Sequence, residues 1–178
     1  MKMLIVMCGC PASGKSTWIK EQVAMANKYL NVEVVSRDAI RFSFLEEGED
    51  YFSKEKEVFK TYCKNISDFL MDKTTDVVIA DATHINKKSR AKLFNNISIP
   101  KDCRLEAVCF ETPLEICLER NAEREGLARV PDEAIYGLYS DYERPTGVEG
   151  FEIIRVYDGI YKTFQLNKKK EIKGNDKF

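Results

Sequence analysis

A motif close to the N-terminus restricts the folds open to this chain more than any other feature. It follows a short apolar run, residues 2–8, and reads Gly9-Cys10-Pro11-Ala12-Ser13-Gly14-Lys15-Ser16. Its glycines allow the backbone to curl so that N–H groups point inward, and the following helix presents the positive end of its dipole to the same point. This spacing is the P-loop pattern, which binds phosphate groups. A chance match in a glycine-rich turn is disfavoured, because an apolar strand pattern precedes the motif and a helical pattern follows it.

The motif assigns separate tasks to its members. Lys15 is expected to reach the β- and γ-phosphates of a nucleoside triphosphate, and the Ser16 hydroxyl is expected to bind Mg²⁺. The backbone N–H groups of the loop complete the phosphate site. Contact with ATP is therefore expected along the whole stretch, namely Gly9, Cys10, Pro11, Ala12, Ser13, Gly14, Lys15, Ser16 and Thr17.

The remainder of the chain alternates apolar runs with helical patterns. The expected strands span 2–8, 32–36, 77–80, 105–110 and 151–156, and the expected helices span 14–29, 38–45, 53–72, 86–95, a stretch that begins at 112, and 131–143. Alternation of this kind predicts an α/β fold of the P-loop NTPase and kinase type, a parallel sheet of about five strands with helices on both faces. Thr112 is expected to cap the helix that begins there, with Pro113 in its first turn and Glu115 closing a capping box.

Length and composition limit the organisation of the chain. Its 178 residues are enough for one domain and too few for two, and 44% of them are hydrophobic. We therefore expect a single P-loop kinase domain over 1–178, with a frayed tail at about 166–178. The longest early apolar run is far shorter than a membrane helix, so no membrane partner is expected. The formal net charge of −1 excludes a global attraction to nucleic acid and leaves only a local patch.

The cysteines indicate the compartment. None of them forms a C-x-x-C pair, and most lie in apolar runs: Cys8, Cys10, Cys63, Cys103, Cys109 and Cys117. This distribution favours buried reduced thiols over a zinc site or a disulfide framework. A cytoplasmic protein is therefore expected.

Polar residues that directly follow a strand are candidate site residues, because ligands of parallel α/β sheets bind beyond the carboxyl ends of the strands. Asp38 and Arg41 follow the second expected strand and lie three residues apart on one helix face. Asp38 could accept the proton of an attacking hydroxyl group, and Arg41 could hold an anion on the acceptor. The alternative is that Asp38 only caps the helix and that Arg41 is a solvated surface charge.

The third expected strand is followed by Asp81, at a position where P-loop enzymes place a carboxylate that orients Mg²⁺ or its waters. A helix cap or a turn residue is the alternative for Asp81. His84 is the only histidine of the chain, and we expect it to form a hydrogen bond at the rim of the site, since Asp38 fills the role of base. Residues 84–104 hold six Lys or Arg and one acid, a basic strip that is either a solvated helix face or a nucleic-acid contact.

Two arginines predict a lid over the site. Arg120 and Arg124 are four residues apart and share one helix face, and Gly126 together with the stretch before Pro131 favours a flexible loop. A lid at about 118–131 could bring both arginines to the charge that develops on a transferring phosphoryl group. The alternative is an exposed helix whose salt-bridge partners are Glu119, Glu123 and Glu125.

Four of these segments together resemble the 5′-hydroxyl polynucleotide kinase family, the kinase module of phage and bacterial nucleic-acid end-healing enzymes. The segments are GCPASGKSTW at 9–18, SRDAIR at 36–41, DATHIN at 81–86 and LERNAER at 118–124. The resemblance implies a P-loop kinase that transfers phosphoryl from ATP, with Mg²⁺, to the 5′-OH end of DNA or RNA. It also implies that Asp38 is the general base and that Arg120 and Arg124 are the lid arginines. Arg41 and Thr83 are similar to the pair that holds the phosphate beside the acceptor hydroxyl.

Other readings of the sequence stay open. The wider P-loop kinase superfamily, with zeta-toxin-like sugar-nucleotide kinases and small metabolite kinases, shares the P-loop, the strand-end aspartate and the lid. Arg41 and Thr83 together favour an acceptor that carries its own phosphate. End-healing enzymes usually carry a phosphatase or ligase module as well, for which this chain has no room. A nucleotide-binding switch or ATPase is disfavoured, because it needs neither Asp38 nor a lid. The choice of DNA or RNA, the base of the donor and the oligomeric state are not determined by the sequence.

Overall fold

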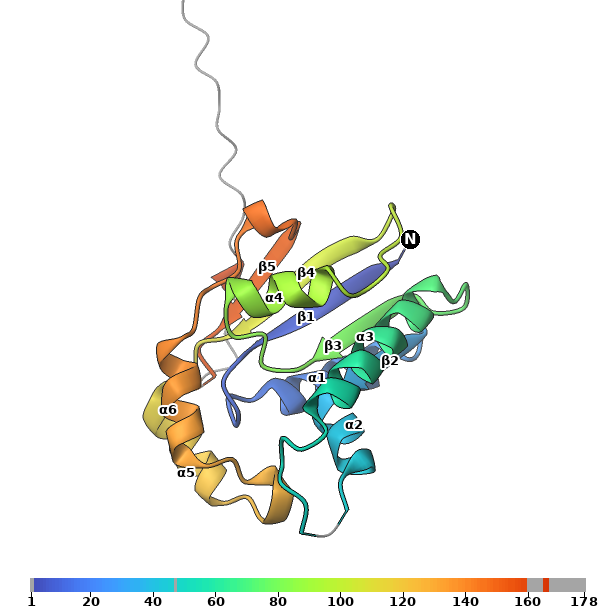
Figure 1. The fold of residues 1–178 in the computed structure, drawn as a ribbon. Coiled ribbons are helices and arrows are strands. Elements are labelled where there is room, and N and C mark those ends of the chain that lie inside the picture. Colours follow the sequence, from blue (N-terminus) through green and yellow to red (C-terminus); the bar gives the residue numbers. More distant parts are fainter. Residues whose placement is uncertain (1, 47, 160–164, 167–178) are drawn as a thin grey trace, which may run out of the picture.

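A twisted, mostly parallel sheet forms the centre of the protein, as the computed structural model shows for residues 2–46, 48–159 and 165–166 (Figure 1). Its strands lie in the order β2-β3-β1-β4-β5-β6. The strands are β1 (Met3–Gly9), β2 (Val32–Ser36), β3 (Val77–Asp81), β4 (Arg104–Phe110), β5 (Ile153–Tyr157) and β6 (Gln165–Leu166). The first five pair in parallel, which confirms the predicted fold class, and β6 adds a short antiparallel edge to β5.

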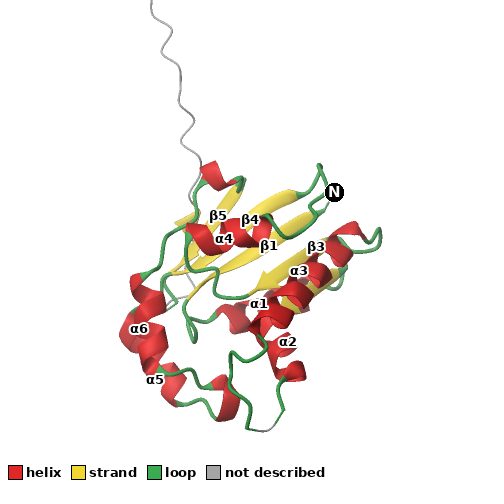
Figure 2. Ribbon diagram, viewed as in Figure 1, coloured by secondary structure: helices red, strands yellow, loops and turns green. Residues whose placement is uncertain are grey.

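Helices cover both faces of this sheet, as predicted (Figure 2). The α-helices are α1 (Lys15–Ala26), α2 (Arg37–Phe44), α3 (Glu55–Met71), α4 (Lys87–Phe94), α5 (Leu114–Ala122) and α6 (Asp132–Ser140). Two short 3₁₀ helices follow α5 and α6, namely η1 (Gly126–Ala128) and η2 (Gly147–Glu149).

The alternation of side chains along β1 divides the core into two layers. Leu4 and Val6 pack in one cluster with the buried face of α3 and with Leu93 of α4. Ile5 and Met7 point to the opposite face, where they pack in a second cluster with α1. Successive strand residues alternate between the two faces of a sheet, so a strand buried on both sides has to be apolar throughout. This requirement explains the unbroken apolar run in front of the P-loop.

Some expected element boundaries are wrong. α5 begins at Leu114 with Pro113 as its N-cap and without a side-chain cap, so the predicted capping box is absent. The Thr112 hydroxyl instead donates a hydrogen bond to the Ser13 carbonyl oxygen over 2.7 Å, because its side chain faces the P-loop and not the first turn of α5. The expected frayed tail lies outside the described residues, apart from Leu166 in β6.

The cysteines have the state expected for them. All six are free thiols, and each is buried except Cys103, which is half-buried. Burial raises the pKa of Cys10, within the P-loop, to about 11, so its thiol stays protonated at neutral pH. In the part of the chain that the structure describes, no helix has the length and apolar character needed to cross a membrane.

Candidate active site

The P-loop adopts a backbone conformation that requires its glycines. β1 ends at Gly9, whose φ of 142° is rarely adopted by residues with a side chain. A Cβ atom at Gly9 would lie 2.8 Å from the Phe110 carbonyl oxygen in the neighbouring strand β4. Gly14, with a φ of 107°, is the N-cap of α1. The two glycines thus allow the loop to pass close to β4 and to open directly into a helix N-terminus.

Lys15 bends back over the loop that it follows. Its ammonium group donates hydrogen bonds to the carbonyl oxygens of Gly9 and Cys10, over 2.9 and 2.7 Å. Burial lowers the pKa of Lys15, and the nearby carboxylate of Asp81 is the largest effect that opposes this shift. A buried cation without a full counter-charge attracts anions strongly, which suits a residue expected to hold phosphate groups.

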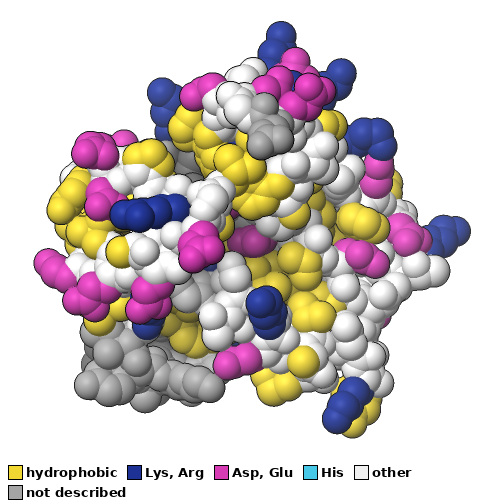
Figure 3. Space-filling view, turned by 90° about the horizontal axis from the view of Figure 1, so that it is seen from below, with side chains coloured by type: hydrophobic (Ala, Val, Ile, Leu, Met, Phe, Trp, Pro, Cys, Tyr) yellow, Lys and Arg dark blue, Asp and Glu magenta, His cyan; other side chains and the backbone are white. Residues whose placement is uncertain are grey.

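A single open cleft of about 1210 Å³ connects the P-loop with the other predicted site residues. It runs from the P-loop past Asp38, Arg41 and Thr83 to the lid residues Arg120 and Arg124. Seen from below in Figure 3, this end of the molecule is hollowed, with apolar and charged side chains intermixed around the hollow. The structure therefore brings together, around one cavity, residues that are far apart in the sequence.

Asp38 and Arg41 lie at the wall of this cleft, in α2. The helix is capped by Ser36, whose hydroxyl oxygen accepts a hydrogen bond from Ala39 N, so Asp38 is not the cap. The Arg41 side chain is 6% exposed, in an ion pair with the 62% exposed Asp38. Arg41 is therefore not a solvated surface charge either. Both simple alternatives from the sequence are excluded by this geometry, and the carboxylate of Asp38 stands in the cleft with a buried guanidinium behind it.

The guanidinium of Arg41 is already surrounded by acceptors. It donates to Asp38, to the Tyr51 hydroxyl over 2.9 Å and to Glu55 Oε2 over 2.7 Å. These bonds use three of its five N–H donors. Two carboxylates thus share its charge, which weakens its attraction for a further anion such as an acceptor phosphate. Arg37 also pairs with Glu55, so this glutamate joins two arginines of α2 to α3.

Oxygen donors suited to Mg²⁺ line the cleft beside the P-loop. Asp81 ends β3 in register with Ser36 of β2, and burial raises the pKa of Asp81, an effect that Lys15 and a hydrogen bond with Ser36 oppose. The Ser16 hydroxyl lines the same cleft. No group of three or more His, Cys, Asp or Glu in the described ranges could enclose a metal ion. Mg²⁺ is usually bound by one or two protein oxygens together with phosphates and waters, so this sparse donor set fits it.

The turn after Asp81 is fixed directly to the P-loop. The Thr83 carbonyl oxygen accepts a hydrogen bond from Gly9 N over 2.9 Å. His84 follows with a left-handed φ of 36°, which is uncommon for a residue other than glycine. Thr83 lines the cleft and is bonded to the first P-loop residue, so a backbone hydrogen bond joins the donor side to the expected acceptor side.

His84 does not lie at the rim of the site, and the expectation that it does is wrong. Its ring is buried, with Nδ1 2.8 Å from the Met7 carbonyl oxygen and Nε2 3.3 Å from the Tyr62 hydroxyl. A carbonyl oxygen only accepts hydrogen bonds, so Nδ1 carries the proton and Nε2 accepts from Tyr62. Burial lowers the pKa of His84 to about 4, which keeps the ring neutral. The histidine is thus a structural residue of the turn.

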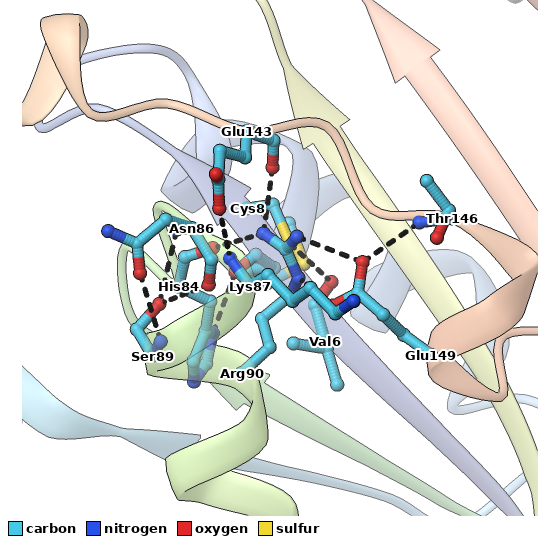
Figure 4. Close-up of polar contacts among 11 residues, drawn as sticks. Val6, Cys8, His84, Asn86, Lys87, Ser89, Arg90, Glu143, Thr146 and Glu149 are labelled. Atoms are coloured by element: carbon cyan, nitrogen blue, oxygen red, sulfur yellow. Dashed lines mark hydrogen bonds and ion pairs between the residues drawn. The ribbon is translucent and has the colours of Figure 1, made fainter.

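Arg90 of α4 forms a hydrogen bond with this turn (Figure 4). It is fully buried and forms a two-bond ion pair with Glu149, over 2.7 and 3.0 Å. It also donates to the carbonyl oxygens of His84 and Glu143. One residue of the basic strip at 84–104, Arg90, is therefore buried and not available at the surface. The exposed part of this strip on α4 consists of Lys87, Lys88 and Lys92.

The lid arginines reach the cleft from α5 and the residues after it. Arg120 donates to the Gly159 carbonyl oxygen over 2.9 Å, and Arg124 donates to that of Ala128 over 3.4 Å. Both side chains line the cleft. Among the residues that the structure describes, neither forms an ion pair with the glutamates interspersed on this segment: Glu119, Glu123 and Glu125.

Asn121 is a buried residue of the expected lid segment, and no sequence pattern singled it out. It is fully buried, its amide group donates to the Val130 carbonyl oxygen over 2.7 Å, and its Oδ1 accepts from Val130 N over 3.0 Å. Asn121, in the last turn of α5, is thus bonded to Val130 at the other end of the segment that contains η1. A single asparagine on a helix gives no sequence signal for such a role, because only the folded loop shows that it is buried.

The sequence is similar to a known protein family and to a known kinase. Residues 4–145 match a family model described as an AAA domain. L-seryl-tRNA(Sec) kinase from Methanococcus maripaludis is 28% identical over 148 residues, which cover 80% of this chain and 53% of that protein. The chain thus spans about half the length of this relative.

Two crystal structures share the fold. A sugar kinase from Janibacter superposes with a TM-score of 0.59 at 16% identity, covering 89% of this chain and 86% of the other. A fungal RNA kinase superposes with a TM-score of 0.57 at 14% identity, covering 87% of this chain and 74% of the other. At these identities the similarity establishes the fold and not the substrate.

Proposed function

The chain belongs to the AAA-domain family whose model covers residues 4–145, and we propose that it is a kinase that transfers the γ-phosphoryl group of ATP to the 5′-OH end of DNA or RNA. The observation that carries this proposal is the shared cleft, in which the P-loop and the exposed carboxylate of Asp38 face one volume. A hydroxyl group bound at Asp38 would lie in the same cavity as the donor phosphates. The name of one relative, a seryl-tRNA kinase, supports an acceptor that carries RNA.

The residues of the cleft have distinct tasks in this proposal. The P-loop backbone and Lys15 hold the β- and γ-phosphates, and Mg²⁺, held by Ser16 and Asp81 with the phosphates, supplies charge neutralisation when bound. Asp38 accepts the proton of the 5′-OH group while the oxygen of that hydroxyl attacks the γ-phosphorus. The bond from that phosphorus to the bridging oxygen of ADP breaks, and the products are ADP and a 5′-phosphorylated end. Lys15, Arg120 and Arg124 stabilise the charge on the phosphoryl group in transit.

Arg41 and Thr83 are proposed to bind the phosphate next to the acceptor hydroxyl. Two observations support a phosphate contact of Thr83: its carbonyl oxygen is bonded to Gly9 N, and Thr83 lines the cleft. Arg41 has a second task in the same proposal, since its ion pair holds the carboxylate of Asp38 in the cleft.

A kinase of a small hydroxyl compound is the second candidate. The observation in its favour is that Asp38 and Glu55 already share the charge of Arg41, which lessens the benefit of a phosphate on the acceptor. A sugar kinase with the same fold shows that the architecture serves small acceptors as well.

Label transfer from γ-labelled ATP tests the proposal. The acceptors are a 5′-OH oligonucleotide of DNA and of RNA, the same strands with a 5′-phosphate, a nucleoside, and a panel of sugars. We expect label on both 5′-OH strands and none on the strands whose end is already phosphorylated. Label on a sugar alone, with both 5′-OH strands inert, would show that the enzyme is the small-molecule kinase.

A further inference from the structure

Three aromatic side chains stand together in the wall of the cleft. Phe42 belongs to α2, and Tyr51 and Phe52 belong to the segment that leads from α2 to α3. The ring of Tyr51 meets both neighbours edge-on, with ring centres 6.4 Å from Phe42 and 4.8 Å from Phe52. Phe42 is 38% exposed and Phe52 is 58% exposed, and neither belongs to the apolar clusters found in the described residues. We call this group of Phe42, Tyr51 and Phe52 the aromatic ledge.

The aromatic ledge is connected to the proposed catalytic base. The Tyr51 hydroxyl donates a hydrogen bond to Asp38 Oδ1 over 3.0 Å. The guanidinium carbon of Arg41 lies 4.4 Å from the centre of the Tyr51 ring, a cation–π contact that holds the ring in place. All three aromatic residues line the same cleft as the P-loop. When the hydroxyl group of an acceptor is bound at Asp38, the rest of the acceptor molecule therefore lies near the aromatic ledge.

The chemistry of the ledge favours a flat, uncharged ligand group. Aromatic rings that are exposed inside a cleft gain free energy when another planar π-system stacks on them. The same segment carries Glu46, Glu49 and Asp50, and of these Glu49 forms an ion pair with Lys54 over 2.9 Å. Acidic side chains repel phosphates but not a neutral ring. The ledge thus suits a nucleobase.

We propose that the aromatic ledge stacks the nucleobase of the acceptor nucleotide that bears the reacting 5′-OH. This inference rests on the proposed function, and it adds a binding site for the first base of the acceptor. Stacking uses the π-face that every base has, so we expect all four bases to be accepted. An acceptor end without a base should bind poorly.

The test compares two oligonucleotides that are identical except at the 5′-terminal residue, which carries either adenine or an abasic tetrahydrofuran. We expect the unmutated protein to prefer the base-bearing end by about 5- to 150-fold in kcat/KM, the range that corresponds to stacking of one base on aromatic side chains. Phe52→Ala should remove most of this preference by lowering kcat/KM much more for the base-bearing end than for the abasic end. Phe52→Trp should retain the preference, since it keeps a stacking ring.

Tyr136→Ala is the matched control, because it removes an exposed aromatic side chain of α6 that does not line the cleft. It should leave the preference intact. ATP binding, measured by calorimetry for every variant, reports whether the fold and the donor site are preserved.

The possible failures are distinguishable. Equal use of both ends by the unmutated protein overturns the ledge and leaves the kinase proposal standing. A preference that persists in the double variant Phe42→Ala and Phe52→Ala also overturns the ledge. Absence of transfer to both oligonucleotides overturns the polynucleotide kinase proposal, and the ledge with it.

Discussion

Asp38 and Arg41 belong to the same turn of α2 but have opposite surroundings. The carboxylate is exposed in the cleft, whereas the guanidinium is buried against Glu55 and Tyr51. At the scale of single residues, the proposed chemistry therefore depends on a charge pair of which only one member meets solvent. The spacing of the two residues in the sequence predicted that they share a face. It could not predict the burial of Arg41, because that depends on residues 10 and 14 positions further along the chain.

The role of Arg41 gives a prediction at this scale. We expect Arg41→Ala to lower kcat/KM more strongly for an oligonucleotide and a nucleoside 3′-phosphate than for a plain nucleoside, because only the first two carry a phosphate beside the sugar. Steady-state transfer to the three acceptors measures this difference. Arg104→Ala, which removes an exposed arginine paired with Glu152, is the control. A defect of equal size on all three acceptors would show that Arg41 only positions Asp38.

His84 gives a prediction for the dependence of stability on pH. Burial lowers its pKa from 6.5 to about 4 in the folded protein. Between these values the unfolded chain binds a proton that the folded protein does not, so stability should fall as the pH decreases from 6.5 toward 4. From pH 7 to pH 5 the contribution of this group amounts to about 2 kcal/mol.

Urea unfolding at pH 7 and pH 5 measures this contribution. His84→Gln should lose about 2 kcal/mol less over this interval than the unmutated protein, since glutamine does not titrate. His84 is the only histidine of the chain, so no other imidazole contributes. An identical pH dependence of both proteins would mean that the ring is protonated in the folded state as well.

At the scale of elements, the proposed lid at about 118–131 comprises the end of α5 and η1, and its two arginines, Arg120 and Arg124, line the cleft. Their spacing predicted that the two arginines share one helix face, and both line the cleft, whereas their role in a lid stays a prediction. The way the lid is held could not be predicted. Asn121 and Thr112 form hydrogen bonds to backbone groups beyond their neighbouring residues, at Val130 and at Ser13, and local sequence patterns do not predict such bonds. The expected capping box at Thr112 failed for this reason.

The bonds of Asn121 predict the behaviour of the lid segment. Asn121→Ala removes an amide group that both donates to and accepts from Val130, and it leaves the half-buried N–H and carbonyl of Val130 without this partner, which costs up to about 1–3 kcal/mol. We expect amide hydrogen exchange in residues 123–130 to accelerate by roughly 5- to 150-fold, with turnover lowered because the lid arginines are held less firmly. Asn96→Ala, at an exposed amide after α4, should leave exchange in this segment unchanged. Unaltered exchange in Asn121→Ala would contradict the assignment.

At the scale of the whole molecule, the strand–helix alternation predicted the parallel sheet and its two covered faces, because each apolar strand has to be buried on both sides. It did not predict the ion pair that joins α4 to η2. Arg90 and Glu149 lie far apart in the sequence, and no local pattern indicates that they meet. In the structure they form a buried ion pair that holds the chain after α6 against the turn of Thr83 and His84.

This buried pair predicts a large loss of stability. Arg90→Ala leaves the carboxylate of Glu149 buried without its partner, and we expect the free energy of unfolding to decrease by about 3–5 kcal/mol. Arg104→Ala removes one member of the exposed pair with Glu152, and we expect it to change stability by no more than about 1 kcal/mol. Urea denaturation compares the two variants. Similar small effects for both would show that Arg90 is solvated in solution.

The central claim is that one cleft couples ATP to a hydroxyl group that Asp38 deprotonates. Its most direct test measures ADP and 5′-phosphorylated oligonucleotide together, for the unmutated protein and for Asp38→Asn. We predict that the two products form in equal amounts, that little ADP forms without acceptor, and that Asp38→Asn lowers the rate of transfer by about 10²- to 10⁴-fold while ATP still binds. Formation of ADP at the same rate without any acceptor, or near-normal transfer by Asp38→Asn, would contradict the account.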